Sequence, residues 1–462
     1  MIEFDFSSVH ADAVGEAHGL TDADLAAEAE RSGGACARLQ EARKAGRLPF
    51  LDLPYQDALV ERIRKETAEW RGRYRNFLLL GIGGSALGPI ALHTALCHRF
   101  HNLLHSPRLF VCDNVDPDET SAILEAIDPR ETLVNVVTKS GETAETLASF
   151  LVVLSRLKDR VGAAWRDHLV FTTDPEKGFL RRFARDEKVR SYEIPPGVGG
   201  RFSIYTPVGL LPAAMVGIDA ARLLAGAAAA DRACRATSAR ENPAWLAAAV
   251  NYLLDRKRGK RIVVMMPYAH ALADVADWFR QLWAESLGKA KDLDGRDVAA
   301  GTTPIRALGA TDQHSQIQLY NEGPNDKHVV FLEATTFDRE VTIPPLGRAD
   351  GSTDFLAGRS LGELLRSERE GTAVALTAAG RPNSLIRLDR VTPESVGALL
   401  YLFEVQTALA GDLYHVNPYD QPGVEAGKKA AFALMGRPGY EAEASRIRSA
   451  SRAARDGWRV SF

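Results

Sequence analysis

The sequence predicts an α/β protein that contains two parallel sheets in tandem, each covered by helices, and three observations support this prediction. Short β-rich runs alternate with helical stretches from Phe77 to about residue 195. A second series of the same kind begins near residue 261. The composition, 45% apolar and 25% charged over 462 residues, excludes disordered, collagen-like and coiled-coil proteins.

The first series contains five candidate strands, and each is followed by a helical stretch. The five are NFLLLG, RLFVCDNVD, TLVNVVTKS, HLVFTTD and VRSYEIP. We expect them to form a doubly wound sheet in a first domain, residues 73–225, whose ligand binds at the carboxyl ends of the strands. Residues 1–72 are rich in Ala, Glu and Arg and show no strong strand, so they predict a helical N-terminal segment that packs on the large domain.

The second series contains the candidate strands RIVVMMPY and KHVVFLEATT and a long helix through ALADVADWFRQLWAESLGK. Two further helices are expected around residues 395–410 and 424–434. These elements define a second domain, residues 226–435, and the two halves can be distant copies of one fold. Residues 436–462 form a C-terminal tail that contains the basic, helix-compatible stretch RIRSASRAARDGWRV.

Charge and cysteine usage indicate a cytoplasmic protein with no nucleic acid or membrane partner. The net charge is −3, so no overall field attracts polyanions. The cysteines at positions 36, 97, 112 and 234 form no CxxC pair, which argues against a disulfide framework. The N-terminus does not resemble a signal peptide, and no apolar run approaches the roughly 20 residues that span a bilayer.

Two loops that follow strands of the first domain suit the binding of an anion. GIGGSALGP (81–89) lets the backbone approach a ligand at a helix N-terminus. A dinucleotide loop is the alternative, but Ala86 replaces the third glycine and no acid lies about 20 residues further on, although Asp113 ends the next strand. TKSGET (138–143) offers one cation and three hydroxyls to a phosphate, or it caps a helix with Ser140 as N-cap.

Two further segments carry side chains that suit proton transfer and anion stabilisation. In GVGGRFSIYTPVGLLPAA, Arg201 can reach developing negative charge, or it can simply lie in a surface turn. In QLWAESLGK, Gln281 and Glu285 are four residues apart and share one face of a helix whose tryptophans suggest partial burial. A partly buried carboxylate there can act as a base, although a lone helical Glu is usually solvated.

Two late segments, TTPIRALGATDQHSQIQLYNEGP and YDQPGVEAGKK, complete the set. His314 follows Asp312 at an apparent helix start, and Lys428 ends a glycine-punctuated stretch. GVEAGKK is not a Walker A loop, because its spacing is one residue short and Lys429 occupies the hydroxyl position. Nucleotide hydrolysis is therefore not expected.

One stretch, HTALCHRFHNLLH, has metal-ligand spacing. A single helix would align His93, Cys97, His101 and His105 on one face. The leucines of the same stretch favour an ordinary amphipathic helix with surface histidines, and no HExxH motif or carboxylate lies nearby. We therefore assign no metal to this stretch.

Taken together and in order, six segments resemble the signature segments of the glucose-6-phosphate isomerase (phosphoglucose isomerase) family. They are GIGGSALGP, TKSGET, GGRFSIYTPVGLLPAA, QLWAESLGK, GATDQHSQIQLY and QPGVEAGKK. The resemblance covers about residues 76–430, and the length is similar to that of the shorter bacterial form. It implies two sugar-isomerase (SIS) domains of αβα sandwich type. It also implies cofactor-free interconversion of glucose 6-phosphate and fructose 6-phosphate, through ring opening and a cis-enediolate, in glycolysis and gluconeogenesis.

The same resemblance implies a role for each matching residue. The residues implied for substrate binding are Gly84, Ser85, Thr138, Lys139, Ser140, Thr143, Gln281 and Gln421. Glu285 would move a proton between carbons 2 and 1 of the opened sugar, and Arg201 would stabilise the enediolate. Lys428 and His314 would transfer protons in ring opening and closing.

The resemblance also implies an obligate homodimer, in which His314 reaches the active site of the neighbouring subunit. Thr138 stands where a serine is common, and we expect only a small change in phosphate fit. Mannose 6-phosphate gives the same enediolate, so it stays open as an alternative or additional substrate. A zinc-dependent isomerase and a non-catalytic sugar-phosphate sensor are two further alternatives.

Overall fold

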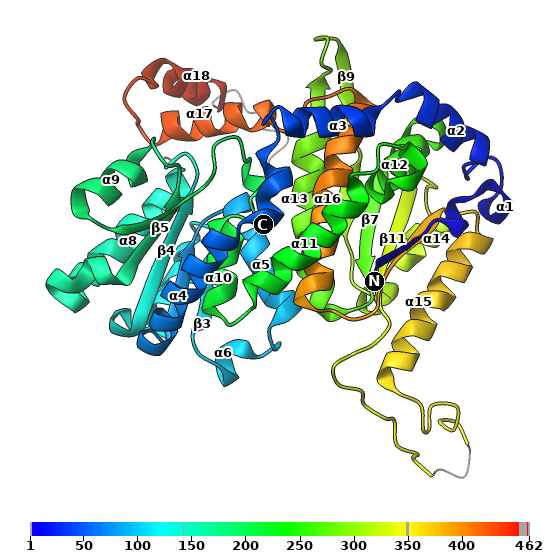
Figure 1. The fold of residues 1–462 in the computed structure, drawn as a ribbon, viewed down its shortest axis with the longest axis horizontal. Helices are drawn as coiled ribbons and strands as arrows, with labels where there is room; N and C mark the ends of the chain where they lie inside the picture. The colour runs from blue at the N-terminus through cyan, green and yellow to red at the C-terminus, as the bar shows by residue number, and fades with distance from the viewer. Residues whose placement is uncertain (1, 142, 348–350, 452–459, 461–462) are drawn as a thin grey trace.

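The structure, a computed structural model, describes residues 2–141, 143–347, 351–451 and 460. Glu142 of the TKSGET loop and most of the chain beyond residue 451 lie outside the described residues, so part of the predicted tail is not placed. Two five-stranded sheets, one in each half of the molecule, are accompanied by helices (Figure 1). The predicted α/β class with two parallel sheets is confirmed.

The first sheet contains all five predicted strands, paired in parallel in the order β3-β2-β4-β5-β6. Their bounds are β2 (Asn76–Leu80), β3 (Arg108–Cys112), β4 (Thr132–Thr138), β5 (Leu169–Thr173) and β6 (Arg190–Glu193). Strands β2, β4 and β5 are buried along their whole length, as expected of parallel strands with helices on both faces. The order of the strands reverses between β2 and β4, which is where ligands bind in such sheets.

The second sheet has the order β1-β12-β11-β7-β10. Its strands are β1 (Ile2–Asp5), β7 (Ile262–Pro267), β10 (Thr303–Arg306), β11 (Lys327–Ala334) and β12 (Asn383–Leu388). Four of these strands are parallel, and their order β10-β7-β11-β12 corresponds to the order β3-β2-β4-β5 of the first sheet. In both sheets the first parallel strand in the chain lies between the second and the third. This shared order supports the expectation that the two halves are copies of one fold. A separate hairpin pairs β8 (Lys289–Lys291) with β9 (Asp297–Ala300).

Eighteen α-helices lie in the described part of the chain. The N-terminal segment contains α1 (Ala11–Val14), α2 (Asp22–Arg31), α3 (Ala35–Lys44) and α4 (Asp57–Arg73). The first domain contains α5 (Leu87–Leu96), α6 (His101–Leu104), α7 (Pro117–Ala126), α8 (Ala144–Val161), α9 (Phe179–Glu187) and α10 (Pro207–Met215). The remaining helices are α11 (Ala220–Cys234), α12 (Pro243–Arg258), α13 (Ala273–Leu287), α14 (Ile317–Glu322), α15 (Leu361–Ala378), α16 (Pro393–Tyr414), α17 (Glu425–Leu434) and α18 (Glu441–Ser451).

Three details of these elements differ from what the sequence suggests. Residues 1–72 do contain a strand, β1; it is only four residues long and is stabilised by antiparallel pairing with the distant β12 rather than by local sequence. The predicted domain boundary at residue 225 falls inside α11, a helix that packs along its length against α16. The histidine-rich stretch forms two helices, since α5 ends at Leu96 and α6 begins at His101. The expectation of surface histidines is wrong for His101, which is buried, and His93 is half-buried.

Helix α16 is the centre of the core between the two sheets. It packs against α11, α12 and α13. It is long and apolar enough to cross a membrane, but 89% of its apolar stretch is buried inside the protein, as expected of a core helix. Helix α13 in turn packs against α5 of the first domain, so the two domains meet along α5 and α13.

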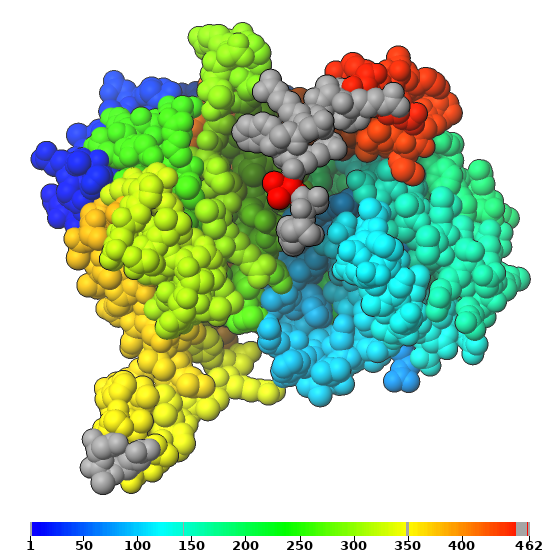
Figure 2. Space-filling view, turned by 180° about the vertical axis from the view of Figure 1, so that it is seen from behind, coloured from blue at the N-terminus to red at the C-terminus, as the bar shows by residue number. Residues whose placement is uncertain are grey.

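The surface is hollowed between the two domains, with sky-blue to teal atoms of the first domain on one side and the green and yellow second domain on the other (Figure 2). The segment between β11 and α15 projects away from the body of the molecule (Figures 1 and 2). A β-bridge between Thr342 and Ser360 holds the base of this projection together. The loops that follow β2 and β4 and the C-terminal end of α13 are the parts of the fold that position the candidate site.

Candidate active site

The glycine-rich loop after β2 and the hydroxyl-rich loop after β4 lie side by side, because the two strands are neighbours in the first sheet. A Cβ atom added to Gly81 would lie 3.3 Å from the carbonyl oxygen of Val137, at the end of β4. The chain then forms a 3-10 turn, η3 (Gly83–Ser85), before α5 begins. The predicted sugar-binding residues Gly84 and Ser85 therefore lie next to the predicted phosphate loop.

The three hydroxyls of the TKSGET loop point toward one another. Thr138 Oγ1 lies 2.9 Å from Thr143 Oγ1 and 3.4 Å from Ser140 Oγ, and the latter two oxygens are 3.5 Å apart. Thr143, not Ser140, is the N-cap of α8, and its side chain makes no capping hydrogen bond, so the expectation that Ser140 caps the helix is wrong. A cluster of hydroxyls at the N-terminus of an 18-residue helix suits a phosphate group.

Lys139 connects the phosphate loop to the segment that carries Arg201. Its Nζ donates a hydrogen bond of 2.7 Å to the carbonyl oxygen of Val198. Burial lowers the pKa of Lys139, and the Asp174 carboxylate opposes this shift. The ammonium group is therefore held in place by the fold before any anion binds.

Arg201, in the 3-10 turn η6 (Gly200–Phe202), is 3% exposed and is the most heavily bonded group of the site. Toward α13, its Nε donates to Ser286 Oγ (2.7 Å) and its Nη1 to Glu285 Oε2 (3.4 Å). Its Nη1 also donates to Gln421 Oε1 (2.9 Å). Its Nη2 donates to the carbonyl oxygens of Pro418 (2.5 Å) and Asp420 (2.9 Å). Burial lowers the pKa of Arg201, and the carboxylates of Glu285 and Asp420 oppose this shift. One guanidinium thus holds α13 and residues 418–421 in a fixed arrangement.

Glu285 lies near the end of α13, with a side chain that is 33% exposed. It accepts a 3.2 Å hydrogen bond from Gln281 Nε2, one turn earlier. The Gln281 amide also lies against the glycine loop, because a Cβ atom on Gly83 would come within 2.9 Å of Nε2. A Cβ atom on Gly84 would lie 2.4 Å from the carbonyl carbon of Gly200. The glycines therefore allow the sugar loop, η6 and α13 to meet at close range.

Lys289 is a site residue that sequence reasoning missed. Its side chain is 5% exposed, and its Nζ donates to the carbonyl oxygens of Glu285 (2.6 Å) and Asp420 (2.7 Å). Burial lowers the pKa of Lys289, and the Arg201 charge lowers it further. Lys289 is the last residue of the segment QLWAESLGK. Its contact with Asp420 can be seen only in the structure, because residues 418–421 are far away in the sequence. The available signal was its spacing of four residues from Glu285.

This arrangement can move a proton beside an oxygen that becomes negative. A partly exposed carboxylate lies 3.4 Å from a buried, fixed guanidinium, and a cluster of hydroxyls with a half-buried lysine lies on the adjacent loop. Such a site combines a base, an anion-stabilising cation and a remote anchor for a phosphate. It suits proton abstraction next to a carbonyl in a phosphorylated sugar.

Comparison with known proteins identifies the family. The family model described as Phosphoglucose isomerase matches residues 56–453, most of the chain. The chain belongs to this family. The glucose-6-phosphate isomerase of Carboxydothermus hydrogenoformans is 47% identical over 428 residues, which is 91% of this chain and 92% of that protein. The glucose-6-phosphate isomerase of Rubrobacter xylanophilus is 51% identical over 388 residues, which is 83% of this chain and 86% of that protein.

Two solved structures have a similar fold. A hypothetical protein from Thermus thermophilus is 37% identical with a TM-score of 0.84, over 94% of this chain and all of that one. A glucose-6-phosphate isomerase from Chlamydia trachomatis shares the fold, with 24% identity and a TM-score of 0.73, over 85% of this chain and 76% of that one. Family membership confirms the predicted enzyme class, an aldose-ketose isomerase, and its place in glycolysis.

Two residues that the phosphoglucose isomerase resemblance assigns to ring opening lie outside this contact network. Lys428, on α17, is exposed and pairs with Glu425 at 3.0 Å. His314 is exposed at the end of the 3-10 turn η9 (Thr311–His314) and takes no part in the hydrogen bonds of Arg201 and Glu285 described above. The structure thus brings together the proton-transfer and phosphate residues of one chain, and it leaves the two ring-opening residues apart from them.

Proposed function

We propose that Glu285 is the proton-transferring base and Arg201 the stabiliser of the enediolate in the interconversion of glucose 6-phosphate and fructose 6-phosphate, the reaction of this isomerase family. The observation that carries this assignment is the 3.4 Å contact between the two side chains beside the Gly83–Ser85 turn. A proton next to a carbonyl is a weak acid, so a carboxylate removes it quickly only if the resulting anion is stabilised at once.

The phosphate is proposed to bind Thr138, Lys139, Ser140 and Thr143. Supporting observations are the converging hydroxyls, the N-terminus of α8 and the position of the Lys139 ammonium on the same loop. Because the phosphate is remote from carbons 1 and 2, its binding energy serves to position the reacting end of the sugar. Gly84, Ser85, Gln281 and Gln421 are proposed to line the sugar between the phosphate and Glu285.

Ring opening and closing are proposed to use Lys428 and His314, with His314 supplied by the second subunit of a homodimer. The exposure of His314 in this single chain is what a residue that serves a neighbouring subunit requires. A cytoplasmic location is part of the same proposal, and the four cysteines, all free, support it.

The decisive experiment measures glucose 6-phosphate formed from fructose 6-phosphate by the purified, exhaustively chelated protein, through a coupled dehydrogenase. We expect rapid, metal-independent turnover. Activity that returns only with zinc would favour a metal-dependent isomerase, and sugar-phosphate binding without turnover would favour a sensor. A parallel assay with mannose 6-phosphate decides whether both aldoses are substrates, since both give the same enediolate.

Replacing the phosphate-loop lysine tests the proposed anchor. We expect Lys139→Ala to raise the Michaelis constants of phosphorylated sugars about 10- to 100-fold, because a charge-assisted contact to the phosphate is lost. Steady-state kinetics of the variant measure the effect. Lys177→Ala is the matched control, since Lys177 is exposed on the neighbouring loop after β5. Unchanged Michaelis constants in Lys139→Ala would remove this lysine from the phosphate site.

Replacing Lys289 tests whether it positions Glu285. We expect Lys289→Met to lower kcat about 10- to 100-fold with little change in KM, because the end of α13 and residues 418–421 lose their shared donor. Lys291→Met is the control, since Lys291 lies in the same strand and is exposed. Among the ion pairs of the described residues, its only partner is Asp297, at 2.7 Å. Partial recovery in Lys289→Arg would support positioning, and equal kcat in the two methionine variants would contradict it.

A further inference from the structure

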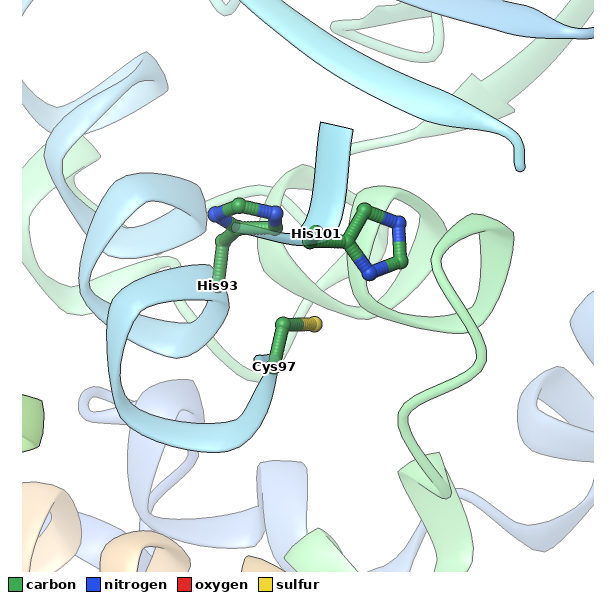
Figure 3. Close-up of side chains that lie close together, drawn as sticks. All are labelled: His93, Cys97 and His101. Carbon is green, nitrogen blue, oxygen red and sulfur yellow. The ribbon is translucent and has the colours of Figure 1, made fainter. Parts of the chain in front are cut away.

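A cluster of metal-binding side chains lies outside the sugar site, at the C-terminal end of α5. His93 lies in the last turn of α5, Cys97 is its C-cap, and His101 begins α6. One ligand atom from each residue lies within 4.8 Å of the other two. Figure 3 shows the two rings and the sulfur gathered around one small space, with a ring nitrogen of His93 on the side of His101.

The tautomer of His101 is fixed by the fold in the form that a metal requires. Its Nε2 lies 2.9 Å from the carbonyl oxygen of Pro107, which can only accept, so Nε2 carries the proton. Nδ1 is then the ring nitrogen that can bind a metal, and Figure 3 shows a ring nitrogen of His101 on the side of Cys97. Ligating histidines commonly donate their second N–H to a carbonyl in this way.

His93 carries a buried polar atom that the protein does not satisfy. Its Nε2 is shielded from solvent, and no hydrogen-bond partner for it lies among the described residues. An unpartnered imidazole nitrogen beside a thiol and a second imidazole is accounted for if a cation binds there.

We propose that His93, Cys97 and His101 bind a Zn²⁺ ion, with water as its fourth ligand. Two imidazoles and one thiolate form a ligand set that zinc prefers, and donor atoms around tetrahedral zinc lie about 3.5 Å apart, so small side-chain rotations close the site. On binding, the Zn–S bond forms, the S–H bond breaks, and the proton leaves to solvent.

The ion would tie the end of α5 to the start of α6. His93 lies six residues after Leu87, the first residue of α5, about 9 Å along the helix, and the sugar loop precedes that helix, so the ion would not touch the substrate. Because α5 begins at the sugar loop and packs against α13, the bound ion would stabilise the first domain without entering the reaction. The proposal therefore does not depend on catalysis, and its tests do not use activity as their readout.

Titration of the reduced, metal-free protein with Co²⁺ and then Zn²⁺ tests the proposal. We expect one Co²⁺ per chain, a thiolate-to-cobalt charge-transfer band, displacement by Zn²⁺, and a Tm that rises with zinc. Cys97→Ala should lose the band. A wild-type chain that binds no Co²⁺ at micromolar protein, or a band that persists in Cys97→Ala, would overturn the proposal.

Two further variants separate metal binding from folding. His93→Leu should lose stoichiometric metal binding, yet its metal-free form should melt at or above the wild-type temperature, because the unsatisfied nitrogen is gone. His98→Gln is the matched control, since His98 lies in the turn between α5 and α6, outside the three-residue cluster, and it should bind zinc as the wild type does. Equal zinc-dependent rises in Tm for His93→Leu and the wild type would also contradict the site.

Discussion

Glu285→Gln is expected to lower turnover by about 10²- to 10⁴-fold while sugar phosphates still bind, because a general base is lost but a neutral isostere remains. Glu285 accepts from Gln281 Nε2 at Oε1 and from Arg201 Nη1 at Oε2, so the single amide oxygen of glutamine can keep only one of these two hydrogen bonds. The substitution keeps the shape of the side chain and leaves the phosphate loop unchanged. Binding measured by calorimetry with a non-isomerisable sugar phosphate should therefore stay close to the wild-type value.

Solvent exchange gives a second readout of the same substitution. In D₂O the wild-type enzyme should place deuterium on the carbon that receives the proton, and Glu285→Gln should lose this exchange together with turnover. Asp277→Asn is the control, because Asp277 lies on the same helix, away from Arg201, and pairs with Arg280 at 2.8 Å. Near-normal turnover in Glu285→Gln would exclude Glu285 as the base.

The sequence predicts the parts of the fold in which local pattern and long-range packing agree. The five strands of the first sheet are apolar runs bounded by turns, and three of them are fully buried, so hydrophobic pattern alone identifies them. The loops of the candidate site follow from the same pattern, because ligand loops lie at the carboxyl ends of parallel strands where the strand order reverses.

The parts that sequence reasoning misses depend on contacts between distant residues. Strand β1 exists because Ile2 and Phe4 pair with β12, at the other end of the chain. Lys289 acquires its place only when residues 418–421 lie against α13. The four-residue spacing of His93, Cys97 and His101 suggested one helix, whereas a break after Leu96 brings the same three side chains together from two helices. The spacing therefore predicted correctly that the three side chains are neighbours, but it did so by assuming one continuous helix that does not exist.

Pairing two inactive variants is expected to restore activity if His314 acts across the dimer. We expect His314→Ala and Glu285→Gln each to lose about 10²-fold or more in turnover as homodimers. In a heterodimer of the two, one active site lacks both groups and the other has both. Differently tagged copies, co-expressed and purified through both tags, should show about half of wild-type activity per dimer, since one of two sites is intact.

This experiment distinguishes a residue that acts in trans from one that acts within its own chain. If His314 served its own subunit, each chain of the heterodimer would lack one group and neither site would recover. Two differently tagged Glu285→Gln chains, purified in the same way, control for wild-type contamination and should stay inactive. Recovery is therefore expected only if His314, exposed on η9 of one chain, completes the site that Arg201 and Glu285 form in the other.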